Sequence, residues 1–322
     1  MRAPAFWTKD GVAGKVLNPA GVIFGAICRL RWCWTSPVSL SVPVICVGNL
    51  VVGGAGKTPV ALSLGERLRR NGQTIHFLSR GYGGTERGPY RVDTRFDIAA
   101  NVGDEALLLA ATSPTWVSHD RAAGAKAAVA AGAEVVIMDD GYQNPSLRKD
   151  LSLLVVDGAY GFGNQRLMPA GPLRELMKDG LARADAVVIL GVDKVGVRAS
   201  LPNHLPVLTG RIVAEPGNLR LAGKRVVAFA GIGRPGKFFE LLQELGCELV
   251  ESQSYPDHHM YRENEVFVLA EKAAKLNALL VTTSKDAVRI SEPMRSMCDV
   301  LTVTVSWDDE SALDKLLSLL GS

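Results

Sequence analysis

Hydrophobic positions from residue 42 onward follow two patterns that alternate along the chain. Short apolar runs, typical of buried strands, occupy residues 42–47, 74–79, 134–138, 151–156 and 186–190. Segments with apolar residues three or four positions apart, which predict helices, lie between them at residues 57–71, 104–111 and 121–131. Strands that alternate with helices predict an α/β fold in which helices cover both faces of a parallel sheet.

The alternation weakens between Pro202 and Pro216, where proline and glycine interrupt the apolar runs. A second set of elements follows, with predicted strands at residues 225–230, 279–283 and 300–305 and a predicted helix at 237–245. We therefore expect four parts, with a domain boundary at the interrupted region. They are an N-terminal segment (1–35), a larger α/β domain (36–205), a linker (206–222) and a smaller α/β domain (223–322).

The N-terminal segment is apolar from Val16 to Cys28 and then carries arginine and tryptophan up to Trp34. This run is too short to cross a bilayer, which needs about 20 apolar residues. An apolar stretch flanked by tryptophan and arginine can lie in the membrane interface. An ordinary core helix fits the same composition, so both interpretations stay open.

Composition and charge exclude several classes of protein. The 322 residues exceed the usual size of one hydrophobic core, and 47% hydrophobic with 21% charged residues is typical of a folded protein. A net charge of +3 is too small to indicate a nucleic-acid partner. The five cysteines form no CxxC pair, so neither a disulfide framework nor a zinc site is expected, and a reducing cytoplasm fits better.

A glycine-rich turn separates the first predicted strand from the helix that follows. Its residues are Gly53, Gly54, Ala55, Gly56, Lys57 and Thr58. Such a turn can direct backbone N–H groups at phosphate oxygens, with Lys57 on the β- and γ-phosphates and the Thr58 hydroxyl on magnesium. The usual first glycine is replaced by Val51, and the second lysine of a related loop class is replaced by Val52. An incidental glycine turn is the less favoured alternative.

Two acidic residues, Asp139 and Asp140, follow the predicted strand at 134–138. Carboxylates at the end of a buried strand are suited to hold magnesium beside a phosphate-binding loop. A helix cap or turn would explain the same Asp-Asp-Gly sequence equally well. The phosphate loop nearby favours the metal site.

Several further motifs resemble the bacterial lipid A 4'-kinase (tetraacyldisaccharide 4'-kinase) family, in the order that the family has them. The two most selective are Ser-Arg-Gly-Tyr-Gly-Gly at residues 79–84 and Pro-Ala-Gly-Pro-Leu-Arg-Glu at residues 169–175. The others are Gly-Asp-Glu at 103–105, Asp-Asp-Gly-Tyr-Gln at 139–143, Gly-Asn at 163–164, Ala-Gly-Ile-Gly at 230–233, Asp-His-His at 257–259 and Lys-Asp-Ala-Val at 285–288. The family usually has histidine where this chain has Asn144 and glutamate where it has Ser284.

The resemblance implies a P-loop kinase fold and an ATP- and Mg²⁺-dependent transfer of the γ-phosphate to a lipid. The acceptor would be the 4'-hydroxyl of a tetraacyl glucosamine disaccharide 1-phosphate, in lipid A biosynthesis. Asp104 matches the family's general base and His258 the histidine that supports it from the second domain. From the residues alone, a helix cap is the favoured interpretation of Asp104, and the neighbouring His259 competes with His258.

The resemblance also indicates residues that would contact the substrate or phosphate: Arg80, Tyr82, Arg121, Gln143, Asn164 and Gln165. Arginine suits phosphate because its planar guanidinium can donate two parallel hydrogen bonds. A solvated arginine at a helix start would explain Arg121 otherwise, and a glycine-rich turn would explain the surroundings of Arg80 and Tyr82.

A lipid acceptor favours the interfacial interpretation of the N-terminal segment, because acyl chains in a membrane cannot diffuse to a distant enzyme. We therefore expect a peripheral protein at the cytoplasmic face of the bacterial inner membrane, with no obligate protein partner and no nucleic-acid partner. Two alternatives remain: a P-loop kinase or ligase that acts on a soluble metabolite, and a membrane-associated nucleotide switch. The absence of the second lysine, at Val52, argues against the switch.

Overall fold

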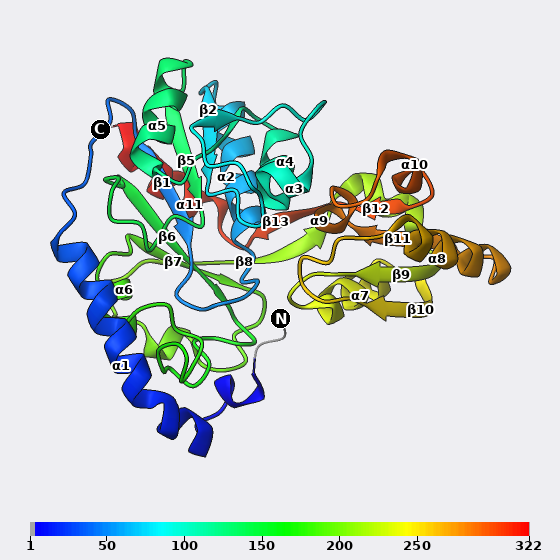
Figure 1. Ribbon diagram of the computed structural model, residues 1–322, viewed down its shortest axis with the longest axis horizontal. Helices are drawn as coiled ribbons and strands as arrows, with labels where there is room; N and C mark the ends of the chain where they lie inside the picture. Colours follow the sequence, from blue (N-terminus) through cyan, green and yellow to red (C-terminus); the bar gives the residue numbers. More distant parts are fainter. Residues whose placement is uncertain (1–3, 322) are drawn as a thin grey trace.

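The computed structural model describes residues 4–321, which form two sheets with helices packed on them (Figure 1). In spatial order the nine strands of the larger sheet are β13 Val303–Trp307, β8 Val207–Ala214, β7 Ala186–Leu190, β6 Leu151–Asp157, β1 Val44–Gly48, β5 Val135–Asp139, β2 Ile75–Ser79, β4 Thr115–Val117 and β3 Tyr90–Arg91. Neighbouring strands are parallel, except that β13 is antiparallel to β8 and β3 to β4. The predicted α/β fold with a large parallel sheet is confirmed.

The first domain also contains the N-terminal helices and those that connect the strands. They are the 3₁₀ helix η1 Ala5–Trp7, α1 Val12–Cys33, α2 Lys57–Arg70, α3 Ala99–Val102, α4 Asp104–Ala110, α5 Arg121–Ala130, α6 Met177–Leu181 and η2 Arg198–Ser200. The last helices of the chain, α11 Glu310–Ser318 and η4 Leu319–Gly321, follow β13.

Both faces of the larger sheet are buried, as a parallel sheet requires. On one face Ile45 and Val47 of β1 share a core with Val60 and Leu64 of α2. On the other face Val44 and Cys46 share a core with residues of α5 and α6. Because successive side chains of a strand point to opposite faces, one short apolar strand contributes to both cores.

Helix α1 lies along the outside of the first domain (Figure 1). Its buried positions are glycines, and a Cβ atom on Gly25 would lie only 2.6 Å from Leu167 Cδ1. Its other side exposes large apolar side chains, among them Val12, Val16, Ile23 and Ile27. A core helix alone does not explain this segment, because that side of the helix is uncovered. Among residues 4–321, no helix is long and apolar enough to cross a membrane.

The second domain is built on a four-stranded parallel sheet in the order β10 Glu248–Ser254, β9 Arg225–Ala230, β11 Leu279–Thr283 and β12 Asp299–Leu301. Its helices are η3 Pro216–Leu221, α7 Pro235–Glu244, α8 Glu263–Lys275, α9 Ser284–Ala287 and α10 Glu292–Arg295. Phe238 and Leu242 of α7 pack into a core with β9, and Val266 and Leu269 of α8 pack into a second core.

The domain boundaries differ from the prediction in two places. The expected linker 206–222 contains β8, a strand of the larger sheet, followed by η3. The expected single strand at 300–305 is two strands in different sheets: β12 completes the second domain, and β13 returns to pair with β8. Helix α11 follows β13 and fixes it to the first domain, because Asp314 of α11 accepts a hydrogen bond from Arg67 of α2 at 2.5 Å. The domain expected over 223–322 therefore ends near residue 301, since burial of β13 and α11 stabilises the first domain.

Candidate active site

The glycine-rich loop lies at the carboxyl edge of the larger sheet, between the end of β1 and the start of α2. Gly53 and Gly56 have positive φ angles of 116° and 90°, which glycine adopts without steric cost. Added Cβ atoms on Gly53 and Gly54 would meet nothing within 4 Å, so this side of the loop faces open space. Lys57 is nearly buried, and its Nζ lies 3.5 Å from Asp140 Oδ2. This is the strand–loop–helix geometry in which a helix start receives phosphate.

The two predicted acidic metal ligands lie beside that loop, because β5 is paired with β1. The Thr58 hydroxyl donates a hydrogen bond to Asp139 Oδ2 at 2.7 Å. The other oxygen, Asp139 Oδ1, is buried and has no hydrogen-bond partner among residues 4–321. Asp140 has a left-handed φ of 54°, and its carboxylate accepts a hydrogen bond from Arg174 at 2.8 Å. An unpartnered buried carboxylate oxygen is costly unless something else binds it.

The pKa values of the two neighbouring carboxyl groups move in opposite directions. Burial and the charge on Glu105 raise the pKa of Asp139 to about 7. Burial also raises the pKa of Asp140, but the charges on Lys57 and Arg174 outweigh it and lower this pKa to about 2. Asp140 therefore has ion pairs with two protein cations, whereas Asp139 has no ion pair within residues 4–321.

These features fit a magnesium ion at Thr58 and Asp139. Magnesium in phosphate-transfer sites usually takes one or two protein oxygens and completes its shell with water and phosphate. No group of three histidine, cysteine or acidic side chains in residues 4–321 is arranged to hold a metal alone. Asp140 is already paired with Lys57 and Arg174, so it is the less suited of the two predicted acidic ligands.

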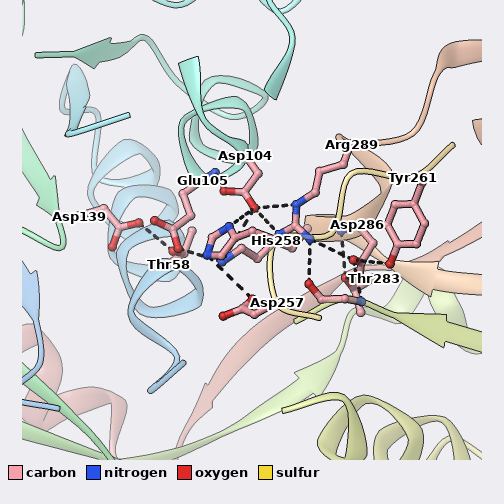
Figure 2. A network of polar contacts seen from close by, with 12 residues as sticks. Thr58, Asp104, Glu105, Asp139, Asp257, His258, Tyr261, Thr283, Asp286 and Arg289 are labelled. Atoms are coloured by element: carbon pink, nitrogen blue, oxygen red, sulfur yellow. Dashed lines mark hydrogen bonds and ion pairs between the residues drawn. The ribbon is translucent and has the colours of Figure 1, made fainter. Parts of the chain in front are cut away.

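Asp104 and His258 meet across the boundary between the two domains (Figure 2). Asp104 is the first residue of α4 and is buried, and its Oδ2 lies 3.0 Å from His258 Nδ1. His258 has a left-handed φ of 60°, a conformation that costs energy for a non-glycine residue and often marks a functional site. His259 instead contacts Glu265 at 3.1 Å. Of the two histidines, His258 is the one placed to act with Asp104.

The surroundings of Asp104 keep it ionised. Burial raises its pKa, but the hydrogen bond to His258 and the charges on Lys285 and Arg289 hold the pKa well below its usual range. Lys285 lies 4.0 Å from Asp104 and donates a hydrogen bond to Glu105 at 3.0 Å. Lys285 thus connects the second domain to the helix that carries Asp104.

Tyr82 lies at the same boundary, and Arg80 and Arg121 lie near each other in the first domain. The exposed ring of Tyr82 lies 5.3 Å from the ring of His258. Arg121 is buried at the start of α5, and its Nη1 donates to the carbonyl of Ser118. Its Nε has no partner among the described residues. Burial and the charge on Arg80 lower the pKa of Arg121 to about 10, so Arg121 remains cationic near neutral pH.

Gln143 and the Pro-Ala-Gly-Pro-Leu-Arg-Glu segment support the phosphate loop. Gln143 Nε2 donates to the carbonyl of Asn49 at 2.8 Å and to Glu175 at 3.0 Å. The backbone N–H of Arg174 donates to the carbonyl of Leu50 at 2.8 Å. Arg174 and Glu175 were missed as site residues, although they belong to the most selective motif. Only the structure shows that this motif pairs with the residues before the glycines.

Asn164 and Gln165 are placed differently from the other predicted substrate residues. Asn164 Nδ2 donates to the carbonyls of Phe6 at 3.1 Å and Ala170 at 3.0 Å, so it ties the N-terminal segment to this loop. Gln165 is exposed, with a left-handed φ of 57°. Neither residue is among the contacts around Asp104 and Lys57, and their role in substrate binding stays a prediction.

Arg289 is the other residue that the sequence did not indicate. It follows the Lys-Asp-Ala-Val motif and is buried, and its Nε donates to Asp104 Oδ2 at 2.8 Å. A lone arginine after a short helix has no local pattern that would reveal this contact, since its partner is 185 residues away in the sequence.

Comparison with known proteins gives one consistent result. The family model of tetraacyldisaccharide-1-P 4'-kinase (LpxK) matches residues 13–321. Tetraacyldisaccharide 4'-kinase from Rhodospirillum rubrum is 51% identical over 324 residues, which cover 99% of this chain and 98% of that protein. The protein of the same name from Rhodospirillum centenum is 52% identical, with 100% of this chain and 97% of that protein covered.

A solved structure agrees with these sequence matches. The structure of LpxK from Aquifex aeolicus in complex with ATP aligns with a TM-score of 0.77 and 28% identity, covering 96% of this chain and 99% of that chain. The matches extend over both domains and over every element that carries Lys57, Asp104, Asp139 and His258. The chain belongs to the tetraacyldisaccharide-1-P 4'-kinase family.

Proposed function

We propose that this protein transfers the γ-phosphate of ATP to the 4'-hydroxyl of a tetraacyl glucosamine disaccharide 1-phosphate, a step of lipid A biosynthesis. Family membership supports the reaction and its acceptor. One structural observation carries the proposal to this chain's own residues. The phosphate loop and Asp104 belong to the first domain, and two second-domain residues reach them: His258 contacts Asp104, and a Cβ on Gly233 would lie 3.5 Å from the backbone nitrogen of Gly54 (Figure 2).

Each residue then has a chemical task. Lys57 and the loop N–H groups would bind the β- and γ-phosphates. Thr58 and Asp139 would hold Mg²⁺, which neutralises phosphate charge when bound. Asp104 would accept the proton of the acceptor hydroxyl, and His258 would orient and stabilise its carboxylate. Phosphoryl transfer passes through a loose transition state, so positioning and charge stabilisation supply most of the catalysis.

Arg80, Tyr82 and Arg121 would contact the acceptor or its phosphate. Arg121 has a buried N–H without a partner among residues 4–321, which an anion could satisfy. Tyr82 exposes its ring beside His258, where a sugar could stack on it. Gln143 fits a supporting role better, because its amide already holds Asn49 and Glu175.

The test is transfer of radiolabel from γ-labelled ATP to the dephosphorylated disaccharide lipid in detergent. We expect label in the lipid and its loss by about 100-fold or more in Lys57→Ala and Asp104→Ala. Val268→Glu, on the exposed side of α8, is the control and should leave transfer unchanged. Label that enters a soluble sugar instead of the lipid would favour the metabolite kinase, and slow hydrolysis with no labelled acceptor would favour the nucleotide switch.

The protein's site of action is proposed to be the cytoplasmic face of the inner membrane, with α1 as the anchor. The exposed side of α1 carries Val16, Ile23 and Ile27, at 70%, 63% and 59% exposure. Exposed apolar surface on a helix next to arginine and tryptophan favours binding at a lipid interface. Leu167 packs against the buried glycines on the other side of α1. One side of the helix therefore packs on the protein, and the other is exposed.

Deletion of residues 1–34 is a poor test of this anchor, because it would also remove Trp7 and Asp10, which hold the loop at Pro169 and Arg166. Residues 1–3 of that segment lie outside the described residues. Charges placed on the exposed side are better targeted. Ile23→Glu with Ile27→Glu should reduce sedimentation with anionic lipid vesicles by about tenfold, through loss of buried apolar area. Phe267→Glu with Val268→Glu on α8 is the matched control. Equal sedimentation of both double variants would contradict the anchor.

A further inference from the structure

Asp104 is held by the second domain through more than His258. Its Oδ2 accepts hydrogen bonds from Arg289 Nε at 2.8 Å and from Arg289 Nη2, as well as the contact with His258 (Figure 2). The Arg289 side chain is only 1% exposed. Its two donors thus reach one oxygen of a buried carboxylate from another domain. The other oxygen, Asp104 Oδ1, accepts from the backbone N–H of Glu105 at 2.9 Å.

Arg289 is itself fixed by a buried network. Its Nη1 donates to the Gly231 carbonyl at 2.8 Å and to Asp286 Oδ1 at 3.1 Å. Asp286 is fully buried and accepts further hydrogen bonds from Tyr261 at 2.8 Å and Thr283 at 2.6 Å. Because these donors are all used, the Arg289 guanidinium is held in one orientation. Little side-chain entropy is therefore lost when it forms its hydrogen bonds with Asp104.

The backbone of Gly231 contacts both Arg289 and His258. Its carbonyl accepts both the Arg289 hydrogen bond and one from the His258 backbone N–H at 3.1 Å. Its own N–H donates to Asp286 at 2.9 Å. A Cβ on Gly231 would lie 3.0 Å from the Tyr261 hydroxyl, so a side chain there would disturb the network. The two second-domain groups on Asp104 therefore share one backbone support.

We propose that Arg289 is a positioning residue for phosphoryl transfer, a fixed guanidinium of the second domain that orients the carboxylate of Asp104. The proposal rests on the kinase function proposed above and deepens it. Arg289 and His258 occupy Oδ2, so Oδ1, which accepts one backbone hydrogen bond, keeps a lone pair for the acceptor proton. The hydroxyl proton then moves to Oδ1 as the acceptor oxygen bonds to phosphorus, and the bond from phosphorus to the bridging oxygen breaks to release ADP.

The electrostatics agree with this geometry. The groups that face Asp104 are His258, Arg289 and Lys285 from the second domain and Glu105 on its own helix. Burial raises the pKa of Asp104, and the hydrogen bond from His258 with the charges of Lys285 and Arg289 lowers it. Removing the Arg289 charge leaves the buried carboxylate less compensated, so its pKa should rise and it should be protonated at higher pH.

Two substitutions separate orientation from charge. Arg289→Met keeps the length of the side chain but removes charge and donors, and Arg289→Lys keeps the charge without the planar guanidinium. We expect kcat to fall about 100-fold in Arg289→Met and about tenfold in Arg289→Lys, with KM for ATP within about twofold of wild type. Arg289→Met should also lose rate on the acidic side of its pH profile, where wild type and Arg289→Lys stay active.

The control is Arg220→Met, which breaks the more exposed Arg220–Asp299 ion pair in the same domain and should leave kcat and the pH profile unchanged. A wild-type protein that labels no lipid would reject the proposed kinase function. An active wild type with Arg289→Met at wild-type kcat and pH profile would overturn the role of Arg289 alone. If Arg289→Met does not fold, a wild-type kcat in a folded Arg289→Lys protein would overturn it equally.

Discussion

Two buried carboxylates of the first domain, Asp104 and Asp157, receive cations of the second domain, and their partners differ. Asp157, at the end of β6, accepts Lys237 at 2.5 Å and also Arg234. Those side chains are 47% and 29% exposed, whereas Arg289 beside Asp104 is 1% exposed. Asp104 also contacts the imidazole ring of His258, whereas the side chains of residues 4–321 that contact Asp157 are those of Arg234 and Lys237.

The difference indicates different tasks for the same kind of ion pair. A solvated lysine can release a carboxylate at little cost, so the Asp157 contacts suit a junction that joins the domains and can open. A buried guanidinium held by its own network cannot move independently, so it orients what it binds. Closure of the two domains around substrate would therefore change the contacts of Asp157 more easily than those of Arg289.

The largest expected effect sharpens this comparison through the two carboxylates themselves. Asp104→Asn keeps the shape of the side chain but removes the negative oxygen, and we expect kcat to fall by about 10²–10⁴-fold. Asp157→Asn should lower kcat by less than about tenfold, because its partners can turn to water. Steady-state label transfer to the lipid measures both. Similar losses of kcat in Asp104→Asn and Asp157→Asn would contradict the proposed difference between the two carboxylates.

Asp139 is a third carboxylate in this comparison: its pKa is raised, whereas the pKa of Asp104 is lowered. Burial and Glu105 raise the pKa of Asp139 to about 7, and a metal binds the ionised form. Protons therefore compete with the metal below pH 7, and affinity should fall about tenfold for each pH unit there. Binding of Mn²⁺ as a stand-in for Mg²⁺, followed by electron paramagnetic resonance, measures this.

Glu105→Gln is the matched variant for that experiment. The negative charge of Glu105 helps to raise the pKa of Asp139. Removing that charge should therefore shift the loss of metal affinity to lower pH. Mn²⁺ affinity that does not change from acidic to mildly alkaline pH would contradict the assignment of Asp139 as a ligand. An unchanged pH profile in Glu105→Gln would contradict the stated cause of its raised pKa.

The smallest expected effect concerns stability at the Asp157 junction. Asp157→Asn leaves two cations without their carboxylate, but both are partly exposed, so the loss in free energy of unfolding should be about 1–2 kcal/mol. Thermal unfolding should shift downward by a few degrees. Lys237→Met, which removes the more exposed partner, should cost less. A loss of cooperative unfolding in Asp157→Asn would show that this junction holds the domains together more strongly than its exposure indicates.

Local patterns in the sequence determined much of this protein. The apolar runs predicted most strands of both sheets within a few residues, because short buried strands need continuous apolar side chains. The glycine turn before Lys57 and the acidic pair after a strand predicted the two halves of the phosphate site. Selective motifs such as residues 79–84 and 169–175 predicted the family, and their order along the chain was sufficient for that.

Only the tertiary structure decided which of these residues meet. The strand expected at 300–305 divides between two sheets, since β12 pairs with β11 and β13 returns to β8. Asp104 contacts His258 and Arg289, both more than 150 residues away. The family resemblance indicated His258, but no local pattern indicates the contact with Arg289. Motifs depend on short-range backbone geometry, whereas these contacts depend on how two domains pack. For that reason local patterns predicted the phosphate loop, the family resemblance alone indicated His258 beside Asp104, and nothing in the sequence indicated Arg289.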